Sequence, residues 1–156
     1  MLTPLFLDIY RKYRDAIQYD KAFFQLCCNH LGFLVTDYNF DFQCNSWEGP
    51  DAGVGASFTN NTLKIGVGMC GFYSLPRLSV MSASETRRGF DLAVLASEYG
   101  FENDDGNFQD TYMRVHPLDG LGQDAVNRQY RDAIADRITR FGICVYDNLD
   151  KFKLAV

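Results

Sequence analysis

The sequence predicts an α+β domain, with a mixed, mostly antiparallel sheet at its centre and helices on both faces of the sheet. Two observations lead to this class. Apolar residues recur every three to four positions near both ends of the chain, as in amphipathic helices, whereas from Phe33 onward polarity alternates at every second residue, as in strands. Because 156 residues can bury one substantial core, and no repeat or linker interrupts them, we expect a single domain over residues 1–156.

The chain is expected to begin with two helices, or with one long helix that bends between them. Pro4 suits the first position of a helix, because the N–H that proline lacks would have had no partner there. Asp20 suits the position before a second helix, since its carboxylate can accept a hydrogen bond from an N–H of the first turn. The second helix is expected to end at Gly32.

Strands are expected next. The alternation from Phe33 to Cys44 predicts a strand, and a loop follows at residues 47–51. A hairpin is predicted from residues 53–59 and 62–68, because asparagines at 60 and 61 tolerate the positive φ of a tight turn. Several glycines leave parts of this hairpin without side chains, which indicates bulges or close approach by another backbone or a ligand. They lie at positions 53, 55, 66, 68 and 71.

The segment from Ser79 to Gly100 is expected to pass from strand to helix. Residues 78–81 have the character of a short strand. Ser82 and Glu85 then fit a capping box, in which each side chain accepts a hydrogen bond from a backbone N–H of the first helical turn. This predicts a helix that begins near Ala83 and ends at Gly100, which supplies a left-handed residue.

The remaining chain predicts one further helix and three strands. Residues 108–116 are expected to form a strand, and residues 126–141 carry an apolar helical stripe that Gly142 would close. Two short strands are expected at residues 143–146 and 151–154, around a turn at Asp147 and Asn148. The complete predicted order is ααβββαβαββ.

Composition and charge exclude several classes of function. The formal net charge is −5, with 15 basic and 20 acidic residues and no basic run, which argues against nucleic acid and is compatible with a basic protein partner. Five cysteines, an odd number without a CxxC pair, indicate neither a disulfide framework nor a zinc module, so we expect reduced thiols. We find neither a signal peptide nor a membrane span, and therefore expect a cytoplasmic protein.

The predicted order, with its central hairpin and a strand-to-helix turn bearing Arg87, Arg88 and Gly89, resembles the GNAT superfamily of N-acetyltransferases. The resemblance implies that backbone N–H groups of this turn bind the pyrophosphate of acetyl-CoA. On the family's spacing Gly89 matches the first glycine of the cofactor motif. Asp91 stands at the second glycine, where a carboxylate would repel pyrophosphate.

Two constellations of cysteine could carry chemistry. Cys27 and His30 lie one helical turn apart and could contribute to a metal site. Cys144 could be a nucleophile if the fold brings it to His116 and Asp147. In both cases the commoner interpretation is a buried thiol that packs as a small apolar group.

Two functional hypotheses follow. The first, which we favour, is a non-enzymatic protein-binding domain that occupies the surface of another protein, as immunity proteins and phage-encoded inhibitors do, without cofactor or metal; self-association into a homodimer is left open. The alternative is an acetyl-CoA-dependent N-acetyltransferase with a divergent loop, in which Tyr130 or Tyr146 would be the general acid. The residues predicted to bind the partner are an aromatic anchor and an acidic rim: Trp47, Glu48, Asp51, Asp104 and Asp105.

Overall fold

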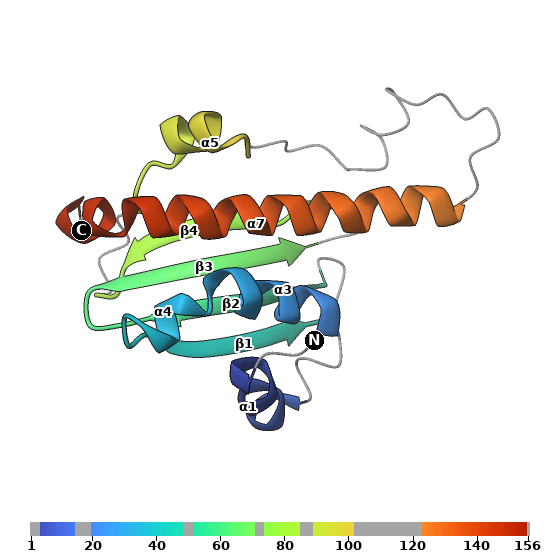
Figure 1. Cartoon of the computed structure of the whole chain (residues 1–156), viewed down its shortest axis with the longest axis horizontal. Helices are drawn as coiled ribbons and strands as arrows, with labels where there is room; N and C mark the ends of the chain where they lie inside the picture. The colour runs from blue at the N-terminus through green and yellow to red at the C-terminus, as the bar shows by residue number, and fades with distance from the viewer. Residues whose placement is uncertain are drawn as a thin grey trace.

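The computed structural model describes residues 4–14, 20–48, 52–70, 74–84, 89–101 and 123–155, and within the last range the side chains of residues 128–154. It contains one four-stranded sheet and several helices, the last of which runs the length of the molecule (Figure 1). The elements are α1 (Pro4–Lys12), α3 (Lys21–Leu31), α4 (Phe33–Thr36), β1 (Asp41–Trp47), β2 (Gly53–Thr59), β3 (Leu63–Cys70), β4 (Arg77–Ser82), α5 (Ala93–Tyr99) and α7 (Gln123–Ala155).

The predicted α+β class is confirmed. The strands follow one another in the order β1-β2-β3-β4, and each neighbouring pair is antiparallel. The register places Gln43 opposite Ser57, Ser57 opposite Gly66, and Gly66 opposite Ser79, so these four residues form one row across the sheet. Since side chains alternate between the two faces along each strand, whole rows share a face.

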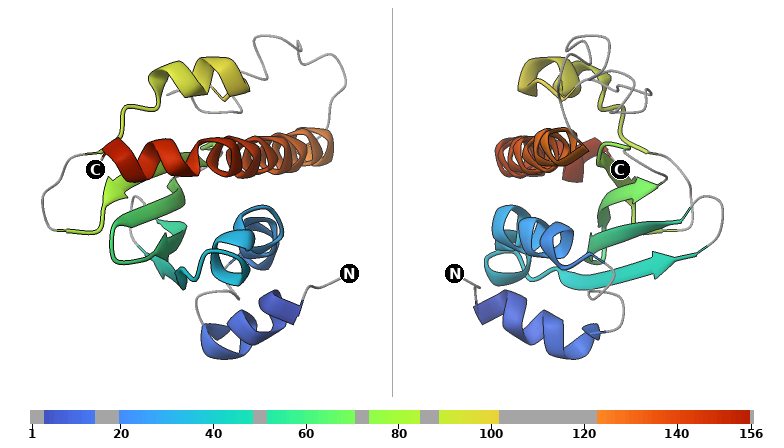
Figure 2. Two further views of the ribbon diagram at one scale, coloured as in Figure 1. Left: turned by 60° about the vertical axis from the view of Figure 1, so that its left-hand side comes forward. Right: turned by 90° about the vertical axis from the view of Figure 1, so that its right-hand side faces the viewer.

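Helices α3 and α7 lie against one face of the sheet, where the core is formed, and no described helix lies over the opposite face (Figure 2). This differs from the expectation of helices on both faces. The reason is composition: the covered face carries fully buried side chains such as Phe58, Leu63 and Ile65, whereas the opposite face carries mostly glycine and polar residues that offer little apolar area to a second helical layer.

The cap at Asp20 is confirmed, because its Oδ1 atom accepts a hydrogen bond from the N–H of Phe23 at 3.0 Å. The predicted strand from Phe33 starts too early. Gly32 has a helical φ of −61°, so the chain continues into the short helix α4. Strand β1 begins only at Asp41, after Asn39 has reversed the chain with a φ of 59°.

The hairpin of β2 and β3 is also confirmed, although its turn does not use positive φ at the asparagines. Instead, the side chain of Asn60 organises the turn. Its Oδ1 atom accepts hydrogen bonds from the N–H groups of Thr62 (2.9 Å) and Leu63 (2.8 Å). This is the local side-chain bonding that makes asparagine frequent in turns.

The capping-box prediction at Ser82 is wrong. Ser82 is the last residue of β4, and its Oγ atom accepts a hydrogen bond from the N–H of Ser84 without starting a helix. Helix α5 begins at Ala93, after Gly89 and Phe90 have returned along the edge of β4 through a bridge to Met81. Pairing within the sheet therefore outweighs a short local capping signal. Gly100, with a φ of 72°, ends α5 as predicted.

The prediction that Gly142 ends the last helix is wrong as well, and the two strands expected after it belong to α7. Gly142 lies where α7 crosses α3: a Cβ atom there would be 2.5 Å from the carbonyl oxygen of His30. Its role is therefore close helix packing. The expected strand at 108–116 lies outside the described residues. The apolar stripe of α7 continues to the end of the helix through Ile134, Ile138, Phe141, Val145, Leu149 and Phe152.

Candidate functional site

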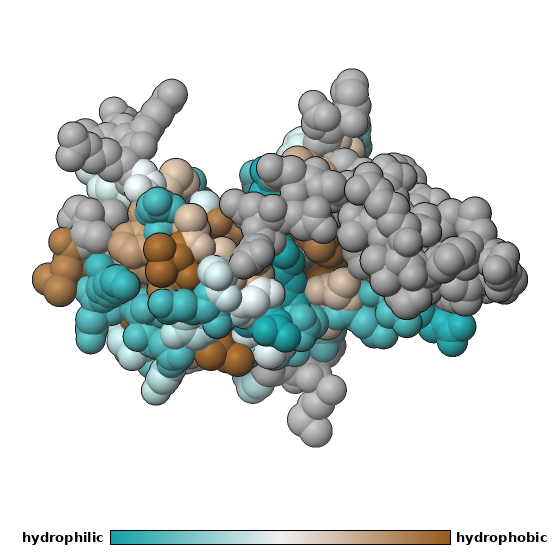
Figure 3. Space-filling view, turned by 90° about the horizontal axis from the view of Figure 1, so that it is seen from above, coloured by the Kyte–Doolittle hydropathy of each residue, from teal (hydrophilic) through white to brown (hydrophobic). Residues whose placement is uncertain are grey.

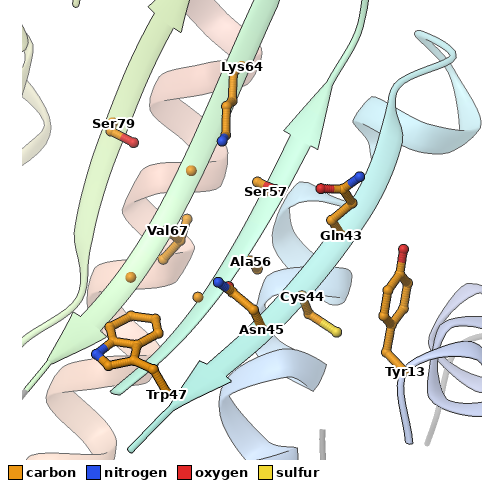
Figure 4. A pocket seen from close by; sticks show the side chains of 13 residues that line it. Tyr13, Gln43, Cys44, Asn45, Trp47, Ala56, Ser57, Lys64, Val67 and Ser79 are labelled. Carbon is orange, nitrogen blue, oxygen red and sulfur yellow. The ribbon is translucent and has the colours of Figure 1, made fainter. Parts of the chain in front are cut away.

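The face of the sheet opposite α3 and α7, here called the open face, is hollowed by a groove of about 460 Å³ (Figure 4). Its side chains come from all four strands, and Tyr13 joins them from the segment after α1. The residues that give the groove its chemistry are Gln43, Asn45, Trp47, Ser57, Lys64 and Ser79, with bare backbone at Gly55, Gly66 and Gly68.

Trp47 lies at one end of the groove and is 38% exposed (Figure 4). A Cβ atom added to Gly53 would be 2.6 Å from the indole Cζ2 atom, and one added to Gly55 would be 3.5 Å from Cζ3. The indole therefore lies across two glycines, in the way that an aromatic ring covers glycine in other sheets. At Gly53 the backbone of Met69 and Cys70 also approaches closely, as the glycines predicted.

The floor of the groove is only partly filled by its own polar side chains. The Oδ1 atom of Asn45 would be 2.9 Å from a Cβ atom on Gly55, and the Oγ atom of Ser79 would be 2.8 Å from one on Gly66. Over Gly68, by contrast, the nearest atom is a backbone oxygen of Val54 at 3.8 Å. Apart from its two chain neighbours, no described side chain lies within 4 Å of a Cβ atom added at Gly68, so the groove has room there for a side chain.

The groove offers hydrogen bonds more than charge. Among its described lining residues, Lys64 is the one that carries a formal charge, and the others are amides, hydroxyls, glycines or apolar groups. Tyr13 forms the wall beside β1, and its hydroxyl donates to the carbonyl oxygen of Phe42 at 2.9 Å, which fixes this wall to the strand. A site with one cation among neutral polar groups can exchange hydrogen bonds with the polar surface of a partner.

The predicted partner-binding residues are only partly placed. Trp47 and Glu48 are exposed neighbours at the end of β1, beside the groove. Asp51, Asp104 and Asp105 lie outside the described residues, so the predicted acidic rim is not tested beyond Glu48.

The two alternative candidates for the general acid lie at different places on α7. The hydroxyl of Tyr130 donates to the backbone oxygen of Ser74 at 2.6 Å, and Tyr146 is exposed beside Phe33. Both tyrosines lie on α7, roughly 24 Å apart by helical rise.

The predicted pyrophosphate loop falls largely outside the described residues, since Arg87 and Arg88 are not among them. Gly89 is described and pairs with Met81 in a bridge. At the start of α5 the N–H of Ala93 donates to the carboxylate of Asp91 at 2.9 Å. This N–H is therefore already paired within the protein.

The buried thiols lack the environment of a nucleophile. Burial raises the pKa of Cys27 well above its usual range and that of Cys144 to about 12, so both are protonated at neutral pH. Cys144 lies on α7, where a strand was expected, and His116 lies outside the described residues. Within the described part of the chain, no group of three or more potential metal ligands occurs.

We predict that one thiol reacts much faster than the others with Ellman's reagent in the native protein. Cys70 is exposed at the end of β3, whereas the remaining four thiols are buried. Native protein at pH 8 should therefore release one equivalent of chromophore quickly, and denatured protein five. Cys70→Ser should remove the fast phase. A fast phase that persists in this variant would contradict the placement of β3.

Trp47 and three glycines of the groove were singled out from the sequence, but its polar side chains were not. Ser57, Lys64 and Ser79 lie on three different strands, and only the register brings them together. The available signal was the alternation along each strand, because every second residue of β1, from Asp41 to Trp47, is exposed. That pattern shows which residues leave the core, but it does not show which residues of other strands stand beside them.

The fold and the groove define an α+β domain whose antiparallel sheet is covered by helices on one side and presents a polar, glycine-rich surface on the other. No protein-family model, curated protein or solved structure matches the chain, so the resemblance to acetyltransferases stays untested. Among the described helices, none combines the length and apolar composition needed to cross a bilayer. Seen from above, the coloured surface is mixed, with brown apolar patches separated by teal polar ones (Figure 3).

Proposed function

We propose that this protein is a non-enzymatic binding domain and that another protein occupies its open face. The observation that carries the proposal is the groove itself: a sheet face without a described helical cover, floored by glycine, with a partly exposed tryptophan at one end. Tryptophan is among the residues enriched at the energetic centres of protein interfaces, because it buries a large rigid area with little loss of conformational freedom.

The size of the face indicates how much a partner must contact. Seven-residue strands are about 23 Å long, and four strands are about 14 Å across between their outer axes, which gives a flat footprint of about 320 Å². A standard interface buries about 800 Å² on each side. The partner is therefore expected to reach beyond the groove, to Glu48 and to the exposed side of α1.

The proposed mode of action is occupation of the partner's surface, as in immunity proteins and phage-encoded inhibitors. The net charge of −5 favours a partner with a basic surface, since opposite charge speeds diffusional encounter. We infer that the protein acts in the cytoplasm, where its five free thiols would remain reduced.

The sharpest test fills the groove without disturbing the fold. Gly68→Thr adds a branched side chain where the nearest atom is 3.8 Å from the new Cβ, and threonine suits a strand. We expect an unchanged or slightly higher Tm and at least about a tenfold loss of affinity, equivalent to about 1.4 kcal/mol, for the partner that co-purifies from the native host. Calorimetric titration measures the affinity, and the fluorescence of Trp47, the one tryptophan of the chain, should change when the partner binds.

The control is Val94→Ala, which changes an exposed side chain on α5, away from the sheet. It should bind the partner as the unmodified protein does. Gly68→Thr is a cleaner test than Trp47→Ala, because removing the indole also uncovers Gly53 and Gly55. If Gly68→Thr folds and binds with unchanged affinity, the open face is not the binding surface.

A further inference from the structure

On the helical side of the molecule, three aromatic rings form a surface row. The ring of Phe33, in α4, stands edge to face with the ring of Tyr38 at 6.1 Å and with the ring of Tyr146 at 5.4 Å. The outer two rings are exposed, Tyr38 to 39% and Tyr146 to 62%. We call Tyr38, Phe33 and Tyr146 the aromatic row.

One end of the aromatic row already holds a cation. The Nζ atom of Lys153 lies 5.4 Å from the centroid of the Tyr38 ring, within the range at which the negative ring face attracts a positive charge. This contact shows the kind of group that the row accepts. Because Lys153 already occupies the Tyr38 ring, we do not expect a further cation to bind at that end.

The other end of the row opens into a hollow of about 270 Å³ where α3 and α7 cross, here called the crossing groove. Tyr146, Phe33 and Ile143 form its apolar walls, and Ile143 is 52% exposed. Gly142 keeps the two helices close beneath it. The polar residues of the crossing groove are Asn29, His30, Thr139 and Asp147.

The polar groups of the crossing groove suit a cation. Asp147 is exposed, and its Oδ2 atom accepts one hydrogen bond, from the hydroxyl of Tyr99 at 2.9 Å. A carboxylate has about four acceptor positions, so one neutral donor leaves room for others. Burial lowers the pKa of His30, and its imidazole is therefore neutral at pH 7 and does not repel a cation.

The position of His30 is fixed by Thr139. The Thr139 hydroxyl donates its proton to the carbonyl oxygen of Ala135 at 2.7 Å. The Nε2 atom of His30, 3.3 Å from the same hydroxyl, must then be the donor of that pair. The floor of the crossing groove is thus ordered before any ligand arrives.

We propose that the crossing groove binds an arginine side chain of a basic protein, with the guanidinium stacked on Tyr146 and hydrogen-bonded to Asp147. Arginine fits better than lysine, because its planar head can stack on a ring and bond a carboxylate at the same time. An apolar side chain would leave the carboxylate without a counter-charge. This inference rests on the proposed function in one respect, which is that the ligand belongs to another protein. The crossing groove itself is separate from the open face.

The test uses N-acetyl-arginine amide as the probe, followed by ¹H–¹⁵N NMR. Titration should shift the amide signals of Thr139, Ile143 and Tyr146, with a Kd on the order of 1 mM. N-acetyl-citrulline amide, in which a neutral urea replaces the guanidinium, should leave these signals in place. Asp147→Asn should weaken binding of the arginine probe about tenfold, whereas Asp150→Asn, which neutralises an exposed carboxylate one turn away, should not.

Equal shifts from the arginine and citrulline probes, no shifts from either, or unchanged binding by Asp147→Asn would overturn the proposal. Each substituted side chain is exposed, so both variants are expected to fold. The probe needs no natural partner. Failure here would therefore leave the test with Gly68→Thr unaffected, and failure of that test would not explain a negative titration here.

Discussion

Gly142→Ala is expected to destabilise the protein by about 3 kcal/mol, the size of a substantial overpacking defect. Helix propensity alone predicts the opposite, because alanine is about 1 kcal/mol better than glycine inside a helix. The structure instead predicts a loss of stability, since the new Cβ would be 2.5 Å from the backbone oxygen of His30 and 3.1 Å from its carbonyl carbon. To relieve this overlap, α3 must shift against α7. Urea unfolding measures the change in the free energy of unfolding.

The matched control is Ile143→Ala, at the next residue of α7. Its side chain is half exposed, so the loss should stay within about 1 kcal/mol. A stabilised Gly142→Ala would mean that α7 does not cross α3 at this glycine.

Asp147→Pro is expected to cost about 3 kcal/mol or more. Position 147 lies inside α7, where proline removes the hydrogen bond to the carbonyl of Ile143 and its ring collides with that carbonyl. The sequence pattern had instead indicated a turn between two strands at this position, where proline is well tolerated. Thermal unfolding followed by circular dichroism distinguishes the two structures.

Asp147→Ala serves as the control for the loss of the carboxylate. It removes the bond from Tyr99 but suits a helix, so the two effects offset each other to within about 1 kcal/mol. Equal Tm values for the proline and alanine variants would contradict a continuous α7.

The elements predicted correctly from the sequence are those governed by nearby residues. The helix that follows Asp20 depends on a bond to a residue three positions away. The hairpin depends on Asn60 and the two residues after it. Gly100 ends α5 through its own φ. Each of these signals lies within a few positions of the structure that it determines.

The failures share one cause, which is contact with distant parts of the chain. Glycine is frequent at helix ends, and Gly142 was therefore predicted to end the helix. In the structure the backbone of His30 occupies the space that a side chain at this position would need. Serine is a common helix N-cap, but Ser82 pairs with Leu63 and belongs to the sheet. In both cases tertiary packing decides between two local structures that the sequence permits.

The candidate site shows the same division. Trp47 was predicted from the sequence as an aromatic anchor for a partner, and in the structure it is partly exposed and borders the groove. Lys64 and Ser79 were not, because their place in the same groove as Ser57 depends on the register of β2, β3 and β4. The crossing groove depends likewise on the packing of two helices far apart in sequence.

The most direct test of the account places a photo-cross-linker on each side of the molecule in cells of the native host. Benzoyl-phenylalanine at Gln43 would lie in the groove of the open face, and at Gln129 it would lie on the exposed side of α7. Both positions are exposed, so the two proteins should fold alike. We predict one discrete cross-linked product from Gln43 and none from Gln129. No product from Gln43, or equal yields from the two positions, would contradict a partner on the open face.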